Sequence, residues 1–123
     1  MLYYMHIVRG IIKNKDKYLL VKRAEKTGGN LWQFVGGHTD RQNPIVALKR
    51  EIAEEVGLKA TKPKLVTAFN NPLTKKKTAF YTTRATGRIK LQAKEISDYG
   101  YFTKKQIQKM PSTYSTKRIM RYL

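Results

Sequence analysis

Three glutamates stand close together in the middle of this chain, at positions that fit one face of a helix. Glu51, Glu54 and Glu55 are spaced i, i+3 and i+4, and residues at this spacing are neighbours on a helix surface. The chain has only eight acidic residues and a formal net charge of +18, so this concentration of like charge is unfavourable unless a cation compensates it. Mg²⁺ prefers carboxylate oxygens, so we predict a Mg²⁺ site here, which Mn²⁺ could also occupy.

The sequence around the glutamates has the features of a complete helix. Asn43 is a favourable N-cap, Pro44 suits the first helical position and Gly57 suits the C-terminal stop. Apolar residues recur at helical spacing between these ends and predict the face that packs against the core: Ile45, Leu48, Ile52 and Val56. The glutamates lie beside this stripe, so we expect them at the edge of the core, partly shielded from water.

Residues 36–58 resemble the signature of the Nudix hydrolases, which is G-x5-E-x7-R-E-U-x-E-E-x-G-U with U a bulky aliphatic residue. With Gly36 as the first glycine, seven further positions match: Arg50, Glu51, Ile52, Glu54, Glu55, Gly57 and Leu58. Gln42 stands where the signature has its first glutamate. An amide can still hydrogen-bond a water on a metal ion, but it supplies no charge and takes no proton.

The expected elements predict an α/β fold. Strands are predicted at residues 3–13, 17–24, 31–35, 65–69, 78–86 and 98–102, a loop at 27–30, and helices at 104–110 and 115–123 in addition to the helix that carries the glutamates. Strands before, between and after one long helix favour an α/β/α sandwich with a mixed β-sheet, and the resemblance implies the same fold. Length and composition favour one domain, residues 1–123, which the resemblance makes a Nudix domain.

The resemblance also implies roles for residues of the signature. Glu51, Glu54 and Glu55 would hold the metal ion, and the carbonyl of Gly36 or of its neighbour would complete the coordination. Glu54 or Glu55 would help to activate the attacking water. Arg50 lies one turn before Glu54 and could orient its carboxylate.

Other candidate residues lie outside the glutamate helix. Glu95 and Asp98 stand where some family members place a downstream carboxylate, and are possible general bases, although an exposed loop is the simpler interpretation of both. The candidates for substrate binding are Lys22, Arg23, Gly37 and His38. An exposed loop position for His38 and a solvated strand end for Lys22 and Arg23 are the alternatives.

The basic excess is spread along the chain rather than gathered in one motif. Such a charge attracts polyanions, so RNA is a possible partner, although the even distribution favours a general surface property. No run approaches the length of a membrane span, and the absence of cysteine agrees with a cytoplasmic location. Family members often dimerise, so a homodimer is possible.

The sequence leaves two functions open. The first is a Mg²⁺-dependent Nudix hydrolase, which cleaves the pyrophosphate bond of a nucleoside diphosphate linked to another moiety, such as a nucleoside triphosphate or a nucleotide sugar. The second is a Nudix-fold module with weakened catalysis that binds nucleotide or RNA. The intact glutamate set favours the first, and Gln42 favours the second.

Overall fold

The computed structural model describes residues 5–25 and 29–123. Its helices and strands, in chain order, are β1 (Ile7–Ile11), β2 (Lys13–Asn14), β3 (Lys17–Arg23), β4 (Trp32–His38), α2 (Pro44–Val56), β5 (Lys59–Asn70), β6 (Lys77–Thr86), β7 (Ile96–Thr103), α3 (Lys104–Lys109), α4 (Tyr114–Ile119) and the 3₁₀ helix η1 (Met120–Tyr122). Among the described residues, no helix is both long and apolar enough to span a membrane.

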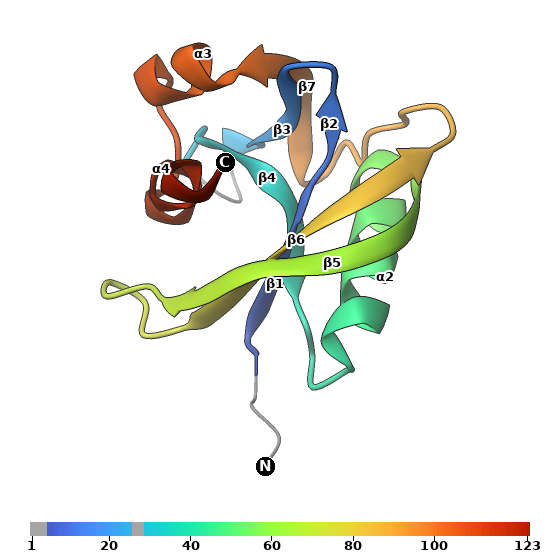
Figure 1. Ribbon diagram of the computed structural model, residues 1–123. Coiled ribbons are helices and arrows are strands. Elements are labelled where there is room, and N and C mark those ends of the chain that lie inside the picture. The colour runs from blue at the N-terminus through green and yellow to red at the C-terminus, as the bar shows by residue number, and fades with distance from the viewer. Residues whose placement is uncertain (1–4, 26–28) are drawn as a thin grey trace.

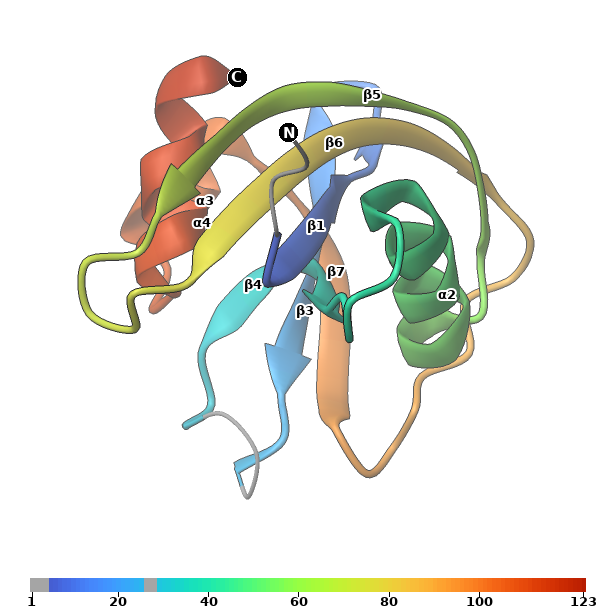
Figure 2. The ribbon, with the colours of Figure 1, turned by 90° about the horizontal axis from the view of Figure 1, so that it is seen from below.

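The strands form one curled, mixed sheet of seven strands (Figure 1). Its order is β2-β3-β4-β1-β6-β5, and β7 pairs with β3 outside this path. The β1–β6 pair is parallel, and the other pairs are antiparallel. Figure 2 shows α2 on one side of the curled sheet and α3 with α4 on the other.

Each face of the sheet has its own hydrophobic core. The α2 side includes Val8, Leu19, Val21, Val35, Leu48, Ile52 and Val56, and the side of the C-terminal helices includes Ile11, Leu20, Phe34, Phe80, Ile107 and Ile119. Alternating residues of β3 and β4 therefore enter opposite cores, as the strand period of two requires. Helices covering both faces of a mixed sheet confirm the predicted α/β/α sandwich.

Strand β4 continues beyond the predicted end at Val35. Its first half pairs with β3 and its second half with β1, where Gly36 lies opposite Arg9 and His38 opposite Ile7. Residues 36–38 are thus strand, and the loop position given as the alternative for His38 was wrong, because β1 supplies a partner that the local sequence does not reveal. A Cβ at Gly36 would overlap the carbonyl oxygen of Val8, so only glycine allows this close pairing.

Other boundaries differ from the predictions for similar reasons. The strand predicted at 65–69 is the end of β5, which begins at Lys59 and pairs along β6 across two bulges. The strand predicted at 3–13 is divided into β1 and β2, and residues 3 and 4 lie outside the described residues. Of the loop predicted at 27–30, residues 27 and 28 also lie outside them, and Gly29 and Asn30 form a turn.

Candidate active site

The helix α2 begins and ends as its sequence predicts. The Asn43 side chain accepts hydrogen bonds from the backbone of Ile45 and Val46, at 2.9 and 3.4 Å. Gly57 adopts a left-handed conformation with φ 70° and donates to the Ala53 carbonyl, which is the usual reason for glycine at this position. These ends fix which residues face the sheet.

The buried face of α2 is rotated from the predicted stripe. Ile45 is 38% exposed, so its assignment to the core was wrong, whereas Ala47 is fully buried. The buried residues of the helix are Ala47, Leu48, Ile52, Glu55 and Val56. The rotation carries one of the glutamates into the interior, deeper than the core edge at which all three were expected.

Glu55 is the buried glutamate. It is 2% exposed, and its Oε1 accepts a hydrogen bond of 3.2 Å from the backbone N–H of Gly36. Burial raises the pKa of Glu55 to about 7, against the opposing effects of Arg9 and of the Gly36 N–H. A carboxylate held here is costly in the absence of a further positive charge, which is the property expected of a cation ligand.

Glu51 lies beside Gly37 and is largely buried. Its side chain is 13% exposed, and a Cβ built on Gly37 would lie 2.7 Å from the Glu51 Cδ. Burial raises the pKa of Glu51, and the negative charges of Glu54 and Glu95 add to this effect. Glu54 is half-exposed, so the three glutamates are graded from the interior to the solvent.

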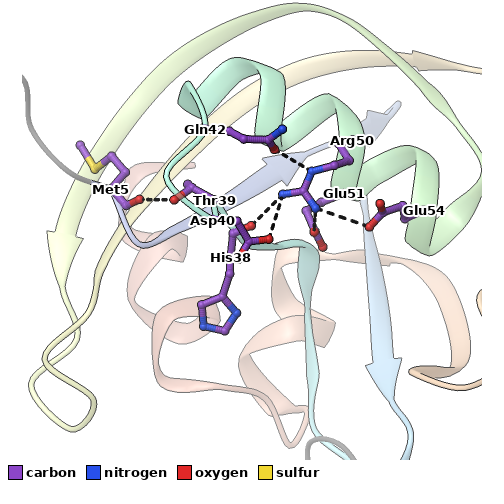
Figure 3. A network of polar contacts seen from close by, with 8 residues as sticks. All are labelled: Met5, His38, Thr39, Asp40, Gln42, Arg50, Glu51 and Glu54. Atoms are coloured by element: carbon purple, nitrogen blue, oxygen red, sulfur yellow. Dashed lines mark hydrogen bonds and ion pairs between the residues drawn. The ribbon is translucent and has the colours of Figure 1, made fainter.

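Arg50 connects the acidic helix with the preceding loop (Figure 3). Its guanidinium lies 2.9 Å from Glu51 and 3.7 Å from Glu54, and it donates to the His38 carbonyl at 3.0 Å. The Arg50 Nε donates to the Gln42 Oε1 at 2.7 Å. Gln42 therefore supports Arg50 through its uncharged amide oxygen, which accepts this hydrogen bond, and is not directed at the glutamates.

The loop between β4 and α2 is anchored at its start. The buried Thr39 hydroxyl donates to the Met5 carbonyl at 2.6 Å, and the Thr39 N–H donates to the His6 carbonyl at 2.9 Å. Asp40 and Arg41 follow in left-handed conformations, with φ 53° and 66°. These backbone angles are normally taken by glycine. The loop therefore has a backbone conformation typical of glycine, although neither residue is glycine.

Two arginines approach the buried glutamate from the sheet. Arg9 of β1 donates to the Phe34 carbonyl at 3.3 Å, and both Arg9 and Arg23 oppose the rise in the Glu55 pKa. The Arg23 Nε is buried and has no hydrogen-bond partner among the described residues. Arg23 was predicted as a substrate ligand. Arg9 was not predicted, although a single charged residue within the apolar run Ile7–Ile11 indicates a functional side chain.

His38 and Lys76 meet at the mouth of this region. The Lys76 Nζ lies 3.0 Å from the His38 Nε2, so the β5–β6 hairpin reaches the start of the loop between β4 and α2. Burial and then the Lys76 charge lower the pKa of His38. Lys22, by contrast, lies over the Trp32 ring at 6.0 Å, and this contact does not direct it to the glutamates.

The structure separates the two predicted general bases. The Glu95 charge contributes to the raised pKa of Glu51, and the segment is fixed by hydrogen bonds from Ala24 N–H to the Glu95 carbonyl and from Gln92 N–H to the Glu55 carbonyl, at 2.8 and 3.0 Å. Asp98 lies on β7 opposite Lys22 and accepts from the Tyr99 N–H. Only Glu95 is brought near the glutamates.

The donor chemistry of the region fits a divalent cation, although no ready-made ligand cage is present. Within residues 5–25 and 29–123, no three carboxylate or imidazole groups converge as a cation site, because Arg50 holds Glu51 and Glu54. However, the negative charge of Glu51 raises the pKa of Glu55. A cation between them would remove this repulsion, and Glu54 would have to leave Arg50 to join them.

The chain is similar in sequence to known proteins. The chain is 39% identical over 89 residues to an 8-oxo-dGTP diphosphatase of Buchnera aphidicola subsp. Schizaphis graminum (strain Sg), covering 70% of this chain and 68% of that protein. It is 37% identical over 59 residues to a CTP pyrophosphohydrolase of Escherichia coli (strain K12), covering 46% and 44%.

Solved structures extend the likeness to almost the whole fold. A MutT NUDIX hydrolase from Burkholderia pseudomallei superposes with a TM-score of 0.85 at 19% identity, covering 98% of this chain and 99% of that one. A MutT protein from Methanosarcina mazei Go1 gives a TM-score of 0.75 at 24% identity, covering 95% and 89%. The family profile described as NUDIX domain matches residues 4–123. The chain therefore belongs to the NUDIX domain family.

Proposed function

We propose that this protein is a Mg²⁺-dependent pyrophosphohydrolase that cleaves the pyrophosphate bond of a nucleoside triphosphate or a related nucleoside diphosphate derivative. The observation that carries the proposal is the placement of Glu55, a buried carboxylate held by the Gly36 N–H beside Glu51. The names of two relatives, an 8-oxo-dGTP diphosphatase and a CTP pyrophosphohydrolase, support a nucleotide substrate.

The glutamates would hold the cation. Glu51, Glu54 and Glu55 supply carboxylate oxygens from one helix, which suits Mg²⁺ and also Mn²⁺. The carbonyl of Gly36 stays a predicted additional ligand. A bound ion would supply positive charge against the phosphates and a Lewis acid for the attacking water.

Basic side chains around the glutamates would bind the phosphates. The buried Nε of Arg23 has an unused donor, and the Arg9 charge acts on the same carboxylate, Glu55. His38 and Lys76 flank the opening. These groups would orient the phosphate chain, while the absence of a side chain at Gly37 leaves room for the Glu51 carboxylate.

Glu95 is the proposed general base. It lies close enough to Glu51 for its charge to raise the Glu51 pKa, and its backbone is fixed to β3 through Ala24. Its carboxylate would accept a proton from the attacking water, whereas Arg50 would position Glu51 and Glu54. Glu54 is the second candidate for the proton acceptor, because it is the most exposed of the three glutamates.

A nucleotide panel tests the proposal. Canonical and oxidised nucleoside triphosphates and nucleotide sugars would be incubated with the protein in Mg²⁺, Mn²⁺ or EDTA, and the release of nucleoside monophosphate, pyrophosphate and phosphate measured. We expect turnover of at least one triphosphate that EDTA abolishes. Nucleotide binding without turnover in either metal would support the alternative, a module with weakened catalysis. RNA binding, homodimerisation and a cytoplasmic location stay predictions.

A further inference from the structure

A second large concavity lies apart from the glutamate helix. It is a half-open groove of about 890 Å³ between the strands at the end of the sheet where β1 leads into β2. One wall comes from Ile11–Asn14, with Tyr18 and Tyr101, and the other from Lys62, Lys64 and residues 82–86. We name this concavity the inter-strand groove. Its volume falls within the range of small-molecule binding sites.

The inter-strand groove is far along the sheet from the catalytic region. On β1, Ile7 pairs with His38 at the catalytic end, whereas Ile11 lines the groove. On β6, Thr78 pairs with Ile7, whereas residues 82–86 line the groove. None of the residues assigned above to the metal, the phosphates or the general base contributes to it.

The charged side chains that line the groove are all cationic. Four cationic side chains line it, Lys13, Lys62, Lys64 and Arg84, and none of the described lining residues is acidic. The three on β5 and β6 are exposed and have no ion pair among the described residues. Unpaired cations around one concavity attract an anion, and phosphate is the anion that Lys and Arg bind most readily in proteins.

The interior of the groove is apolar and aromatic. Ile11 and Ile12 are almost fully buried, and Tyr18 is 8% exposed, with its ring packed edge-on against Phe34 and the Lys13 Nζ 5.5 Å from the ring centroid. Burial raises the pKa of Tyr101, so its phenol stays neutral and able to donate a hydrogen bond. An anion that fits these walls needs an apolar body as well as its charge.

The backbone of β5 is distorted where its lysines line the groove. Strand β5 has a register shift between Thr61 and Lys64, and Lys62 within it takes a left-handed conformation with φ 52°. A bulge redirects side chains, and here Lys62 and Lys64 both line the groove. A left-handed lysine is unfavourable, so the distortion that places these cations has an energetic cost.

We propose that the inter-strand groove is a second, non-catalytic binding site for a compact phosphate ester with a planar, apolar body, of the class of nucleoside monophosphates. Its cations would hold the phosphate, and its isoleucine and tyrosine walls would hold the planar group. The confinement of the cations to one concavity favours such a small ligand over a nucleic-acid strand, which needs an extended basic track with several stacking positions. This site goes beyond the proposed hydrolysis.

The test uses AMP, which has no pyrophosphate bond, with the full chain in EDTA at a fixed ionic strength. Amide chemical shifts would be followed by NMR during titration of wild type and two triple variants. The groove variant is Lys62→Gln, Lys64→Gln, Arg84→Gln. The control is Lys105→Gln, Lys109→Gln, Arg121→Gln, which removes the same residue types from exposed positions outside the groove. Both carry the same net charge, so they separate the groove from general electrostatics.

The expected result is a set of saturable amide shifts at residues 11–14, at Lys62 and Lys64 and at residues 82–86. AMP affinity should be at least about tenfold lower in the groove variant and within about twofold of wild type in the control. Equal losses in both variants would overturn the proposal in favour of non-specific attraction. Shifts confined to residues 36–55 would also overturn it. A single-stranded decanucleotide that shifts the groove amides when AMP does not would assign the groove to nucleic acid instead. These outcomes do not depend on catalytic turnover.

Discussion

The missing side chain of Gly37 makes the space that the Glu51 carboxylate occupies. A Cβ at this position would overlap the Glu51 Oε1 and lie 2.7 Å from its Cδ. Gly37 has no positive φ among those recorded for the chain, so a larger residue is excluded by this neighbour and not by its backbone angles. The strand β4 and the helix α2 therefore pack closely where Gly37 meets Glu51.

Gly37→Ala should therefore displace Glu51, reduce turnover and lower the free energy of unfolding by about 1–3 kcal/mol, as expected for overpacking. A double-mutant cycle with Glu51→Ala checks the cause, since removing the carboxylate should relieve most of the destabilisation. Urea denaturation of the four proteins measures it. Equal destabilisation in both backgrounds would place the strain elsewhere.

Changing Glu54 or Glu55 to Gln should lower turnover by about 10²-fold or more, because each change keeps the shape but removes a charged ligand of the proposed cation. The matched control is Asp16→Asn, which removes one negative charge from an exposed turn between β2 and β3. Steady-state rates with Mg²⁺, together with circular dichroism to verify folding, measure the effect. Wild-type rates in both glutamate variants would eliminate the site.

The metal-free protein should lose stability as pH rises from about 4.5 to 7. The folded-state pKa of Glu55 is raised to about 7, so the folded state binds more protons than the unfolded state in this window, and the free energy of unfolding falls with rising pH. The full loss would be on the order of 3 kcal/mol. Denaturation in EDTA at several pH values measures this loss. The free energy of unfolding of Glu55→Gln should depend less on pH over the same window.

Gln42→Glu should convert the hydrogen bond to Arg50 into an ion pair. Gln42 is exposed, so we expect a gain in stability below about 1 kcal/mol that high salt removes. Thermal melting at low and high ionic strength measures this. Because the side chain faces Arg50, Mg²⁺ affinity should change little, and an increase of about tenfold or more would show that position 42 enters the metal site.

Lys76 and Lys75 provide a matched pair in the β5–β6 hairpin. Lys76 contacts His38 at the mouth of the site, so Lys76→Met should raise the KM for a nucleoside triphosphate by about threefold to tenfold with a smaller effect on kcat. Lys75→Met removes the same charge one residue away and should leave KM within about twofold. Equal changes in KM would indicate diffuse attraction by the hairpin.

The sequence by itself determined the features of the site that depend on neighbours along the chain. The boundaries of α2 follow from Asn43, Pro44 and Gly57, and the spacing of the glutamates follows from the helical repeat. The alternation of strands with one long helix was also sufficient to predict a sandwich with a mixed sheet. These properties depend on contacts within about one helical turn, or on periodicity, and both are visible in a single sequence.

The tertiary structure decided the features that depend on contacts between segments far apart in the sequence. It continued β4 to His38 by pairing it with β1, it buried Glu55 by rotating the helix face towards the sheet, and it directed Gln42 to Arg50. It placed Glu95 near the glutamates and left Asp98 on β7. Each outcome depends on strand register and on the curl of the sheet, which are set by the packing of the whole core and leave no local pattern in the residues themselves.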